Sequence, residues 1–179
     1  MSASSACDRN PQAVIVPEFE FTYSFSGGLA GWTPAAADIG TGSWSATESS
    51  GALRLELVNA SGAGKAWLTH ELEVTPDKAY AVVIEFDLAT ADHDAAQAWK
   101  LIAGAGPKPP VTVAELPFQD GTSSGGPAGE TVWVKRAYAG AVQPDEEGKL
   151  YLTLGIWGTT TGSRSYLIDN VKVVLTRTE

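Results

Sequence analysis

The sequence is poor in the residues on which several kinds of chemistry and structure depend. It contains one cysteine, Cys7, one methionine and two histidines among 179 residues, so no disulfide bond can form within this chain. No apolar run reaches the roughly 18–20 residues that a membrane span requires. Nucleophile-elbow, HExxH, Walker and dinucleotide-binding motifs are all absent. These absences argue against a disulfide-stapled fold, a membrane span and the common classes of hydrolase, metalloprotease and nucleotide-binding enzyme.

Charge is also sparse, and most of it is negative. Charged residues make up 18% of the chain, and the formal net charge is −9. This balance disfavours binding to nucleic acids and to anionic membrane surfaces, and it suits neutral ligands or cations. The 19 glycines, ten prolines and six tryptophans indicate strands and loops instead of helices. The 44% hydrophobic content is enough for one domain with a substantial core.

Short stretches rich in β-branched and aromatic residues alternate with turn signals along the chain. Strands are predicted over residues 14–25, 42–47, 52–58, 65–74, 79–88, 98–104, 111–116, 131–139, 149–157 and 164–175. This pattern predicts an all-β fold, a two-sheet antiparallel β-sandwich with jelly-roll topology. One short helix is predicted over 92–100, and long loops are predicted within 104–130.

The first twelve residues, MSASSACDRNPQ, lack an apolar pattern. We expect residues 1–12 to form a disordered tail, without an intact signal peptide, and residues 13–179 to form one jelly-roll domain. The stretch SSAC before a polar, proline-containing tract resembles the mature end of a bacterial lipoprotein, which implies a lipid anchor at Cys7. Ser4 stands where an aliphatic residue is usual in that pattern, and the alternative is that Cys7 is an incidental thiol.

Catalytic chemistry finds little support among the titratable residues. His70 falls on an apolar row of its predicted strand, and His93 lies between two aspartates in a stretch that also suits a helix cap. Glu85 and Asp87 share one strand face and could form a glycosidase pair, but such neighbours are more often surface acids. We therefore expect a binding protein, with a glycoside hydrolase or lyase as a distant alternative.

Several large aromatic side chains fall on strand faces that alternation assigns to solvent. An exposed aromatic patch marks a recognition surface, and flat rings beside hydrogen-bonding groups suit the apolar faces and polar edges of sugars. Trp32 and Trp44 are expected to be packing residues at a sheet edge. If the other rings are dispersed or covered by loops, a protein-interaction role is favoured instead. The predicted ligand-binding residues are Trp67, Trp133, Trp157, Tyr151 and Tyr166, with Lys135 and Arg164 as polar neighbours.

The last predicted strand, 164–175, carries an acid in an apolar row. Strict alternation puts Asp169 on the same face as Leu167, Val171, Val173 and Leu175. A buried, unpaired carboxylate costs several kcal/mol, so Asp169 requires a cation, dense hydrogen bonding or protonation.

Three stretches resemble jelly-roll carbohydrate-binding modules of the galactose-binding-like fold. FEFTYSFSGGLAGWT (19–33) resembles their opening strand and turn, KAWLTHELEVTPDKAYAVVIEFDLAT (65–90) their middle strands, and LYLTLGIWGTTTGSRSYLIDNVKVV (150–174) their closing hairpin. The similarity spans residues 13–175. It implies a non-catalytic, secreted or cell-surface domain that binds a poly- or oligosaccharide, which we expect to be a monomer. The alternative is a structural or protein-interaction domain of a bacterial surface lipoprotein without a sugar site.

The resemblance also implies a structural calcium where the first strand meets the last. Asp169 matches the acid of the closing motif, and Glu20 matches the acid of the opening one. Glu20 has the opposite parity to Phe19 and Phe21, however, so it should face away from the core unless the strand bulges. Glu18 is a second candidate ligand. The alternative for Asp169 is a carboxylate that accepts hydrogen bonds from backbone N–H groups, with no metal.

Overall fold

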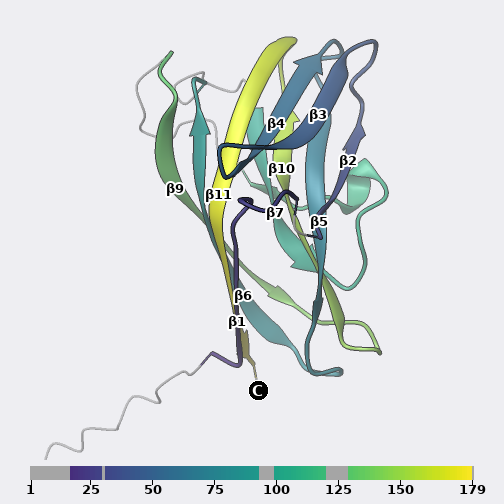
Figure 1. Ribbon diagram of the computed structural model, residues 1–179. Coiled ribbons are helices and arrows are strands. Elements are labelled where there is room, and N and C mark those ends of the chain that lie inside the picture. The colour runs from purple at the N-terminus through teal and green to yellow at the C-terminus, as the bar shows by residue number, and fades with distance from the viewer. Residues whose placement is uncertain (1–16, 30, 93–98, 120–128, 179) are drawn as a thin grey trace, which may run out of the picture.

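Two antiparallel β-sheets pack against each other in the computed structural model, which describes residues 17–29, 31–92, 99–119 and 129–178 (Figure 1). Sheet A runs in the order β3 (Ser43–Ser49), β4 (Ala52–Asn59), β11 (Gly162–Arg177), β6 (Tyr80–Thr90) and β9 (Val132–Val142), and β1 (Phe19–Tyr23) also pairs with β11. Sheet B runs in the order β2 (Thr33–Ala37), β5 (Lys65–Glu73), β10 (Lys149–Gly158), β7 (Trp99–Gly106) and β8 (Phe118–Gln119). The predicted all-β, two-sheet sandwich is confirmed.

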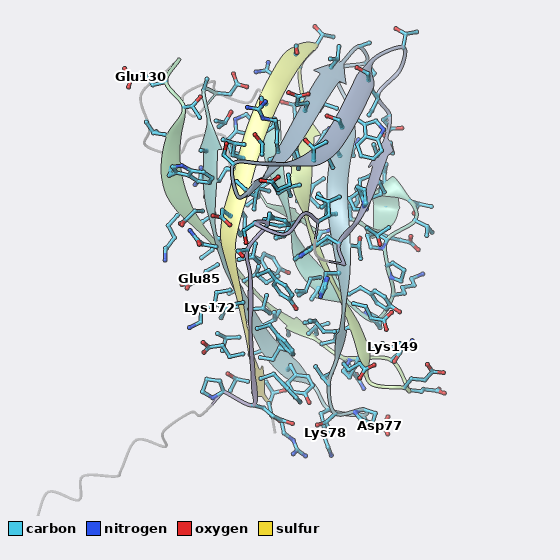
Figure 2. The ribbon with its side chains drawn as sticks, in the orientation of Figure 1. Asp77, Lys78, Glu85, Glu130, Lys149 and Lys172 are labelled. Carbon is cyan, nitrogen blue, oxygen red and sulfur yellow. The ribbon has the colours of Figure 1, made fainter. Side chains whose placement is uncertain are left out.

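The core lies between the sheets and follows the two-residue alternation of the strands. Every second side chain of β6, from Tyr80 to Leu88, is buried, and so is the aliphatic row from Leu150 to Ile156 on β10. Trp99 is also buried and meets the ring of Tyr166 edge to face, with 5.6 Å between centroids. The side chains at the intervening positions of each strand point outward, as Figure 2 shows for the neighbouring side chains of Glu85 and Lys172 on sheet A.

A β-bulge in β11 reverses this alternation. The register with β6 shifts between Asp169 and Lys172, and Asn170 adopts a φ of 51°. Tyr166 and Ile168 are buried before the bulge, and Val171, Val173 and Leu175 are buried after it. Strict alternation therefore assigned the wrong face to the residues before the bulge: Asp169 is not part of the core row, and Tyr166 is 0% exposed instead of facing solvent. The predicted core positions after the bulge, Val171, Val173 and Leu175, are confirmed. The bulge adds one residue to the strand, which moves each later side chain to the other face.

The segment after β7 also differs from the sequence prediction. Instead of a strand over 111–116, Val113–Glu115 forms a single 3₁₀ turn. The carboxylate of Glu115 accepts hydrogen bonds from the backbone N–H groups of Val111 and Thr112, at 2.9 and 3.1 Å, and from Nζ of Lys108 at 2.8 Å. These bonds satisfy the backbone locally, so the segment needs no partner strand.

Pairing of β2 with β5 was not predicted, because TPAAA has no β-branched residue after Thr33.

Other sequence predictions fall partly or wholly outside the described residues. The tail 1–12, Cys7 and His93 lie there, so disorder of the tail and the lipid anchor stay predictions. The predicted helix 92–100 is described only at its ends, where Trp99 and Lys100 belong to β7. No helix long and apolar enough to cross a membrane occurs in the described ranges.

Candidate functional site

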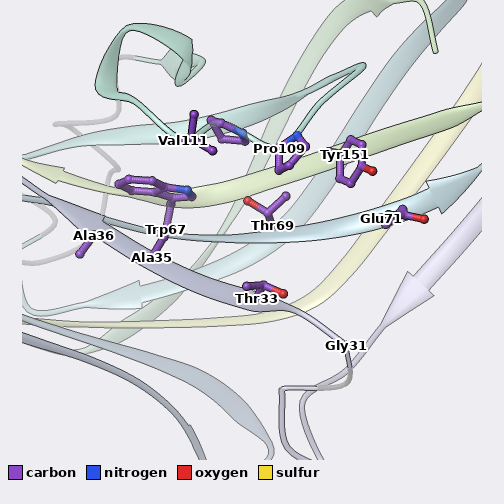
Figure 3. A pocket seen from close by; sticks show the side chains of 11 residues that line it. Gly31, Thr33, Ala35, Ala36, Trp67, Thr69, Glu71, Pro109, Val111 and Tyr151 are labelled. Atoms are coloured by element: carbon purple, nitrogen blue, oxygen red, sulfur yellow. The ribbon is translucent and has the colours of Figure 1, made fainter. Parts of the chain in front are cut away.

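A groove lies on the outer face of sheet B, where the side chains that point away from the core are small, aromatic or hydroxylated. Trp67, Thr69 and Glu71 follow one another along β5. Their cross-strand partners continue the surface on both sides: Thr33 lies opposite Thr69 on β2, and Tyr151 lies opposite Glu71 on β10. Figure 3 shows the three β5 side chains along the floor of the groove, with the β2 residues on one side of them.

The other wall of the groove is the loop between β7 and β8. Pro109, Pro110 and Val111 line it, and Val111 is 77% exposed at the rim. The hydrogen bonds of Glu115 hold this wall, and the same contacts lower the pKa of Glu115 to about 2, chiefly through Lys108 and then the two backbone N–H groups. The groove encloses a volume of about 650 Å³, within the range of pockets that hold small ligands.

Trp67 closes one end of the groove and is almost fully covered. It is 2% exposed, because it packs with Ile102 of β7 and Leu116 of the loop. Gly155 lies opposite it on β10, where any Cβ would overlap the Cα and Cβ of Trp67. The expectation that Trp67 stands exposed on a polar face is therefore wrong: the loop covers that face. Its Nε1 is buried and has no hydrogen-bond partner among the described residues.

Glu71 sets the electrostatics of the groove, because it is the one ionisable acid or base other than Tyr151 among the described lining residues. Nζ of Lys149 lies 3.3 Å from its carboxylate and neutralises it from outside the groove. A hydrogen bond to Glu71 raises the pKa of Lys149 and also raises the pKa of Tyr151. The floor is thus polar but carries almost no net charge.

Trp157 lies on the same sheet face but beyond the groove. It packs against the cluster of Trp67, and Nζ of Lys65 and Nζ of Lys100 lie over its ring, at 4.7 and 5.3 Å from the centroid. Lys65 is itself buried and holds Asp38 at 3.0 Å. These cations cover the indole surface that the sequence analysis had assigned to a ligand.

Trp133 and its predicted polar neighbours lie on the opposite sheet. Trp133 is 51% exposed on the outer face of β9, and Lys135 follows on the same face. Arg164 lies on β11 and pairs with Asp92 at 3.1 Å. Trp67, Trp133 and Trp157 therefore do not share one groove, because alternation cannot tell which sheet a strand joins. This is the dispersed arrangement for which the sequence favours a protein-interaction role over sugar binding through these rings. That these residues bind a ligand stays a prediction.

The three candidate calcium ligands do not meet at one point. Glu20 pairs with Lys172 at 3.0 Å, and Glu18 accepts hydrogen bonds from the hydroxyls of Thr75 and Tyr80 at 3.0 and 3.3 Å. Glu20 is the register partner of Val174, five residues along β11 from Asp169, which is about 16 Å along a strand. No group of three or more possible metal-ligating side chains occurs within the described ranges. This arrangement does not fit a calcium held by Glu18, Glu20 and Asp169, and calcium binding stays a prediction.

The sequence analysis missed part of the groove. Thr33, Thr69, Glu71 and the wall Pro109–Val111 were not proposed as ligand contacts. A signal for a break after β7 was present, since Pro107, Pro109 and Pro110 have no N–H to donate to a strand ladder. It was not used, and a strand was predicted over 111–116 instead. No such signal marked β2, whose pairing depends on the tertiary structure.

Comparison with known proteins supports the fold assignment. No protein-family model and no curated protein matches the sequence. Among solved structures, the K1 cleaved adhesin domain of Lys-gingipain from Porphyromonas gingivalis W83 superposes with a TM-score of 0.55 at 13% identity, over 87% of this chain and 97% of that one. TmCBM27, a carbohydrate-binding module described for its specific recognition of mannan, superposes with a TM-score of 0.51 at 14% identity, over 91% and 98%.

These likenesses define the class of the fold. The chain is a jelly-roll β-sandwich of the kind found in carbohydrate-binding modules, so the resemblance seen in the sequence motifs is confirmed at the level of the fold. At these identities the likeness says nothing of the residues that bind. The function must therefore be argued from the groove itself.

Proposed function

We propose that this chain is a non-catalytic carbohydrate-binding domain and that the groove on the outer face of sheet B is its binding site. The observation that carries the proposal is the composition of the groove. The ring of Tyr151 and the apolar wall of Pro109 and Val111 offer surfaces for the C–H faces of a sugar. The hydroxyls of Thr33 and Thr69 lie on the neighbouring strands β2 and β5 and can donate to or accept from sugar hydroxyls.

The charge of the groove favours a neutral glycan. Glu71 can accept hydrogen bonds from sugar hydroxyls, while Lys149 balances its charge. A polyanionic chain would meet no cation among the described lining residues. The structural likeness to TmCBM27, which recognises mannan, supports a neutral polysaccharide as the first ligand to test.

A binding role fits the acids of the groove better than catalysis. Glycosidases use two carboxyl groups about 5–9.5 Å apart on either side of the scissile bond. Glu71 is the single acid among the described lining residues. The pair considered in the sequence, Glu85 and Asp87, faces outward from sheet A, on the opposite side of the sandwich.

We also propose that the domain acts outside the cell, in a secreted or cell-surface protein, since that is where polysaccharides are met. A lipid anchor at Cys7 would hold it there. Labelling with a radioactive fatty acid in a bacterial host, with Cys7→Ala as the control, tests this anchor. Incorporation into the wild type alone supports it, and equal labelling contradicts it.

Affinity gel electrophoresis with a panel of neutral polysaccharides tests the sugar proposal, and isothermal titration follows for any that bind. We expect micromolar to millimolar affinity, because a few contacts are offset by the ordering of a flexible chain. Tyr151→Ala should weaken binding by about two- to tenfold, as the loss of one aromatic contact implies. Trp44→Ala, which removes an exposed indole on edge strand β3, is the matched control and should bind like the wild type.

Two results would contradict the proposal. Binding that survives Tyr151→Ala unchanged but is lost in Trp133→Ala would move the neutral-sugar site to sheet A. Absence of binding to every glycan tested would favour the alternative of a structural or protein-interaction domain.

A further inference from the structure

A second surface with ligand-binding chemistry lies on the outer face of sheet A, on the opposite side of the sandwich from the groove. Four residues form one row across this sheet, because each is the register partner of the next: Arg54, Leu167, Ala89 and Trp133. Directly opposed side chains on one face lie about 5 Å apart. The row therefore has a cation at one end and a half-exposed indole at the other, with the half-buried Leu167 and the buried Ala89 between them.

A small pocket opens beside this row. Its volume is about 190 Å³, and Arg54, Ala89 and Leu167 belong to its lining together with Arg164, Asp92 and Thr131. Thr131 lies two residues before Trp133, so the indole stands at the edge of the pocket. The volume is below the roughly 300–1,000 Å³ of pockets that enclose a drug-sized ligand, so the pocket suits one small group of a larger molecule.

The pocket gathers two guanidinium groups on a protein whose net charge is strongly negative. Two guanidinium groups and one carboxylate, that of Asp92, lie among its described lining residues, whereas the chain as a whole carries −9. Asp92 pairs with Arg164 at 3.1 Å, and Glu56, outside the pocket, pairs with Arg54 at 3.6 Å. The Nε groups of Arg54 and Arg164 are both buried without a hydrogen-bond partner in the part of the chain that is described. These donors match a planar anion.

We propose that this surface is a second binding site and that it takes a sugar bearing a carboxylate, that is, a uronic acid residue. The carboxylate enters the pocket beside Arg54 and Arg164, and the sugar ring lies on the indole of Trp133. The carboxylate pairs with the guanidinium groups of the pocket, and the sugar ring packs on the exposed indole. One ligand therefore accounts for both features.

Isothermal titration with a galacturonic acid trisaccharide and with its methyl ester tests the proposal. The ester keeps the sugar rings and replaces each carboxylate with a neutral methyl ester. We expect the acid to bind with micromolar to millimolar affinity and the ester to bind at least about tenfold more weakly. Binding of the acid should weaken as salt is raised, because the contacts are ionic and close to solvent.

Variants locate the site. Because Arg164 also pairs with Asp92, its replacement could disturb the fold. We therefore choose Arg54→Gln and Trp133→Ala as the test variants. Each should weaken binding of the acid by at least several-fold while far-UV circular dichroism and the melting temperature stay close to the wild type. Arg177→Gln is the matched control, since it removes the same charge from an exposed position outside this pocket and should leave binding unchanged.

Three outcomes would overturn the proposal: no binding of the acid at millimolar concentration, equal binding of acid and ester, or unchanged binding in Arg54→Gln. A sulfated trisaccharide that binds while the uronate does not would overturn the choice of ligand. The site does not depend on the proposed function of the groove. Tyr151→Ala should leave uronate binding intact, so the two proposals can fail separately.

Discussion

Asn170 decides which side chains of β11 reach the core. At its φ of 51° an asparagine is tolerated, whereas a β-branched residue is strongly disfavoured. We expect Asn170→Val to destabilise the fold by about 1–3 kcal/mol. Asn170→Gly keeps the conformation and loses only the 2.8 Å hydrogen bond to Asp87, so it should cost about 1 kcal/mol or less. Urea denaturation measures both, and equal losses would contradict the role of the bulge.

Asn59 joins two loops through its buried side chain. Its Nδ2 donates to the carbonyl oxygens of Gly158 and Thr160, both at 2.8 Å, and its Oδ1 accepts from the backbone N–H groups of Gly62 and Gly64. The residue is 1% exposed, so Ala at position 59 would leave several backbone groups without partners.

The expected loss for Asn59→Ala is more than about 3 kcal/mol, since each unsatisfied buried group costs about 1–3 kcal/mol. Thermal and urea unfolding measure it. Ser43→Ala, at an exposed position, is the control and should stay within about 0.5 kcal/mol of the wild type. A loss of less than 1 kcal/mol for Asn59→Ala would show that water replaces these contacts.

At the scale of the element, the loop between β7 and β8 determines the shape of the groove. Its wall is held by one carboxylate, that of Glu115, whose pKa is lowered from 4.5 to about 2. A group with a lowered pKa contributes stability that is complete above its unfolded pKa and is lost as the pH falls through the folded one. The loop should therefore stay closed at neutral pH and loosen as the pH falls from about 4.5 toward 2.

Loosening should expose Trp67, which lies beneath the loop. We expect acrylamide to quench the wild-type fluorescence more strongly at pH 2.5 than at pH 6, and Glu115→Gln to show the stronger quenching already at pH 6. Glu130→Gln, at an exposed position before β9, serves as the control. Quenching that is the same for Glu115→Gln and wild type at pH 6 would mean that the apolar contacts of the loop suffice to hold it.

The same elements show how far sequence reasoning reaches. Alternation of side chains in the sequence matches the buried rows of β6 and β10, because these strands are regular and have one face on the core. It failed for Asp169 and Tyr166, because one extra residue in β11 reverses the pattern and no local signal identifies a bulge at Asn170. It failed for Trp67, because a loop distant in the sequence covers a face that its own strand suggests is exposed.

At the scale of the whole molecule, the two sheets separate two surfaces of different chemistry. The groove on sheet B is nearly neutral and includes Tyr151, whereas the surface on sheet A gathers Trp133 and two arginines. The motifs at the two ends of the chain predicted the jelly roll, since they correspond to β1 and to β10 and β11, but the expected closing hairpin is wrong because β10 and β11 lie in different sheets. They could not predict that the aromatic residues divide between two outer faces, because that depends on the order of strands within each sheet.

The central claim is that a neutral glycan binds in the groove of sheet B, and amide chemical-shift mapping tests it most directly. A ¹H–¹⁵N correlation spectrum is recorded while an oligosaccharide of mannan is added, followed by other neutral oligosaccharides if mannan fails. We predict shifts at the amides of Thr33, Thr69, Val111 and Tyr151, with those of Arg54 and Trp133 unmoved. Shifts confined to Arg54, Trp133 and their neighbours, or no shifts with any neutral glycan, would contradict the account.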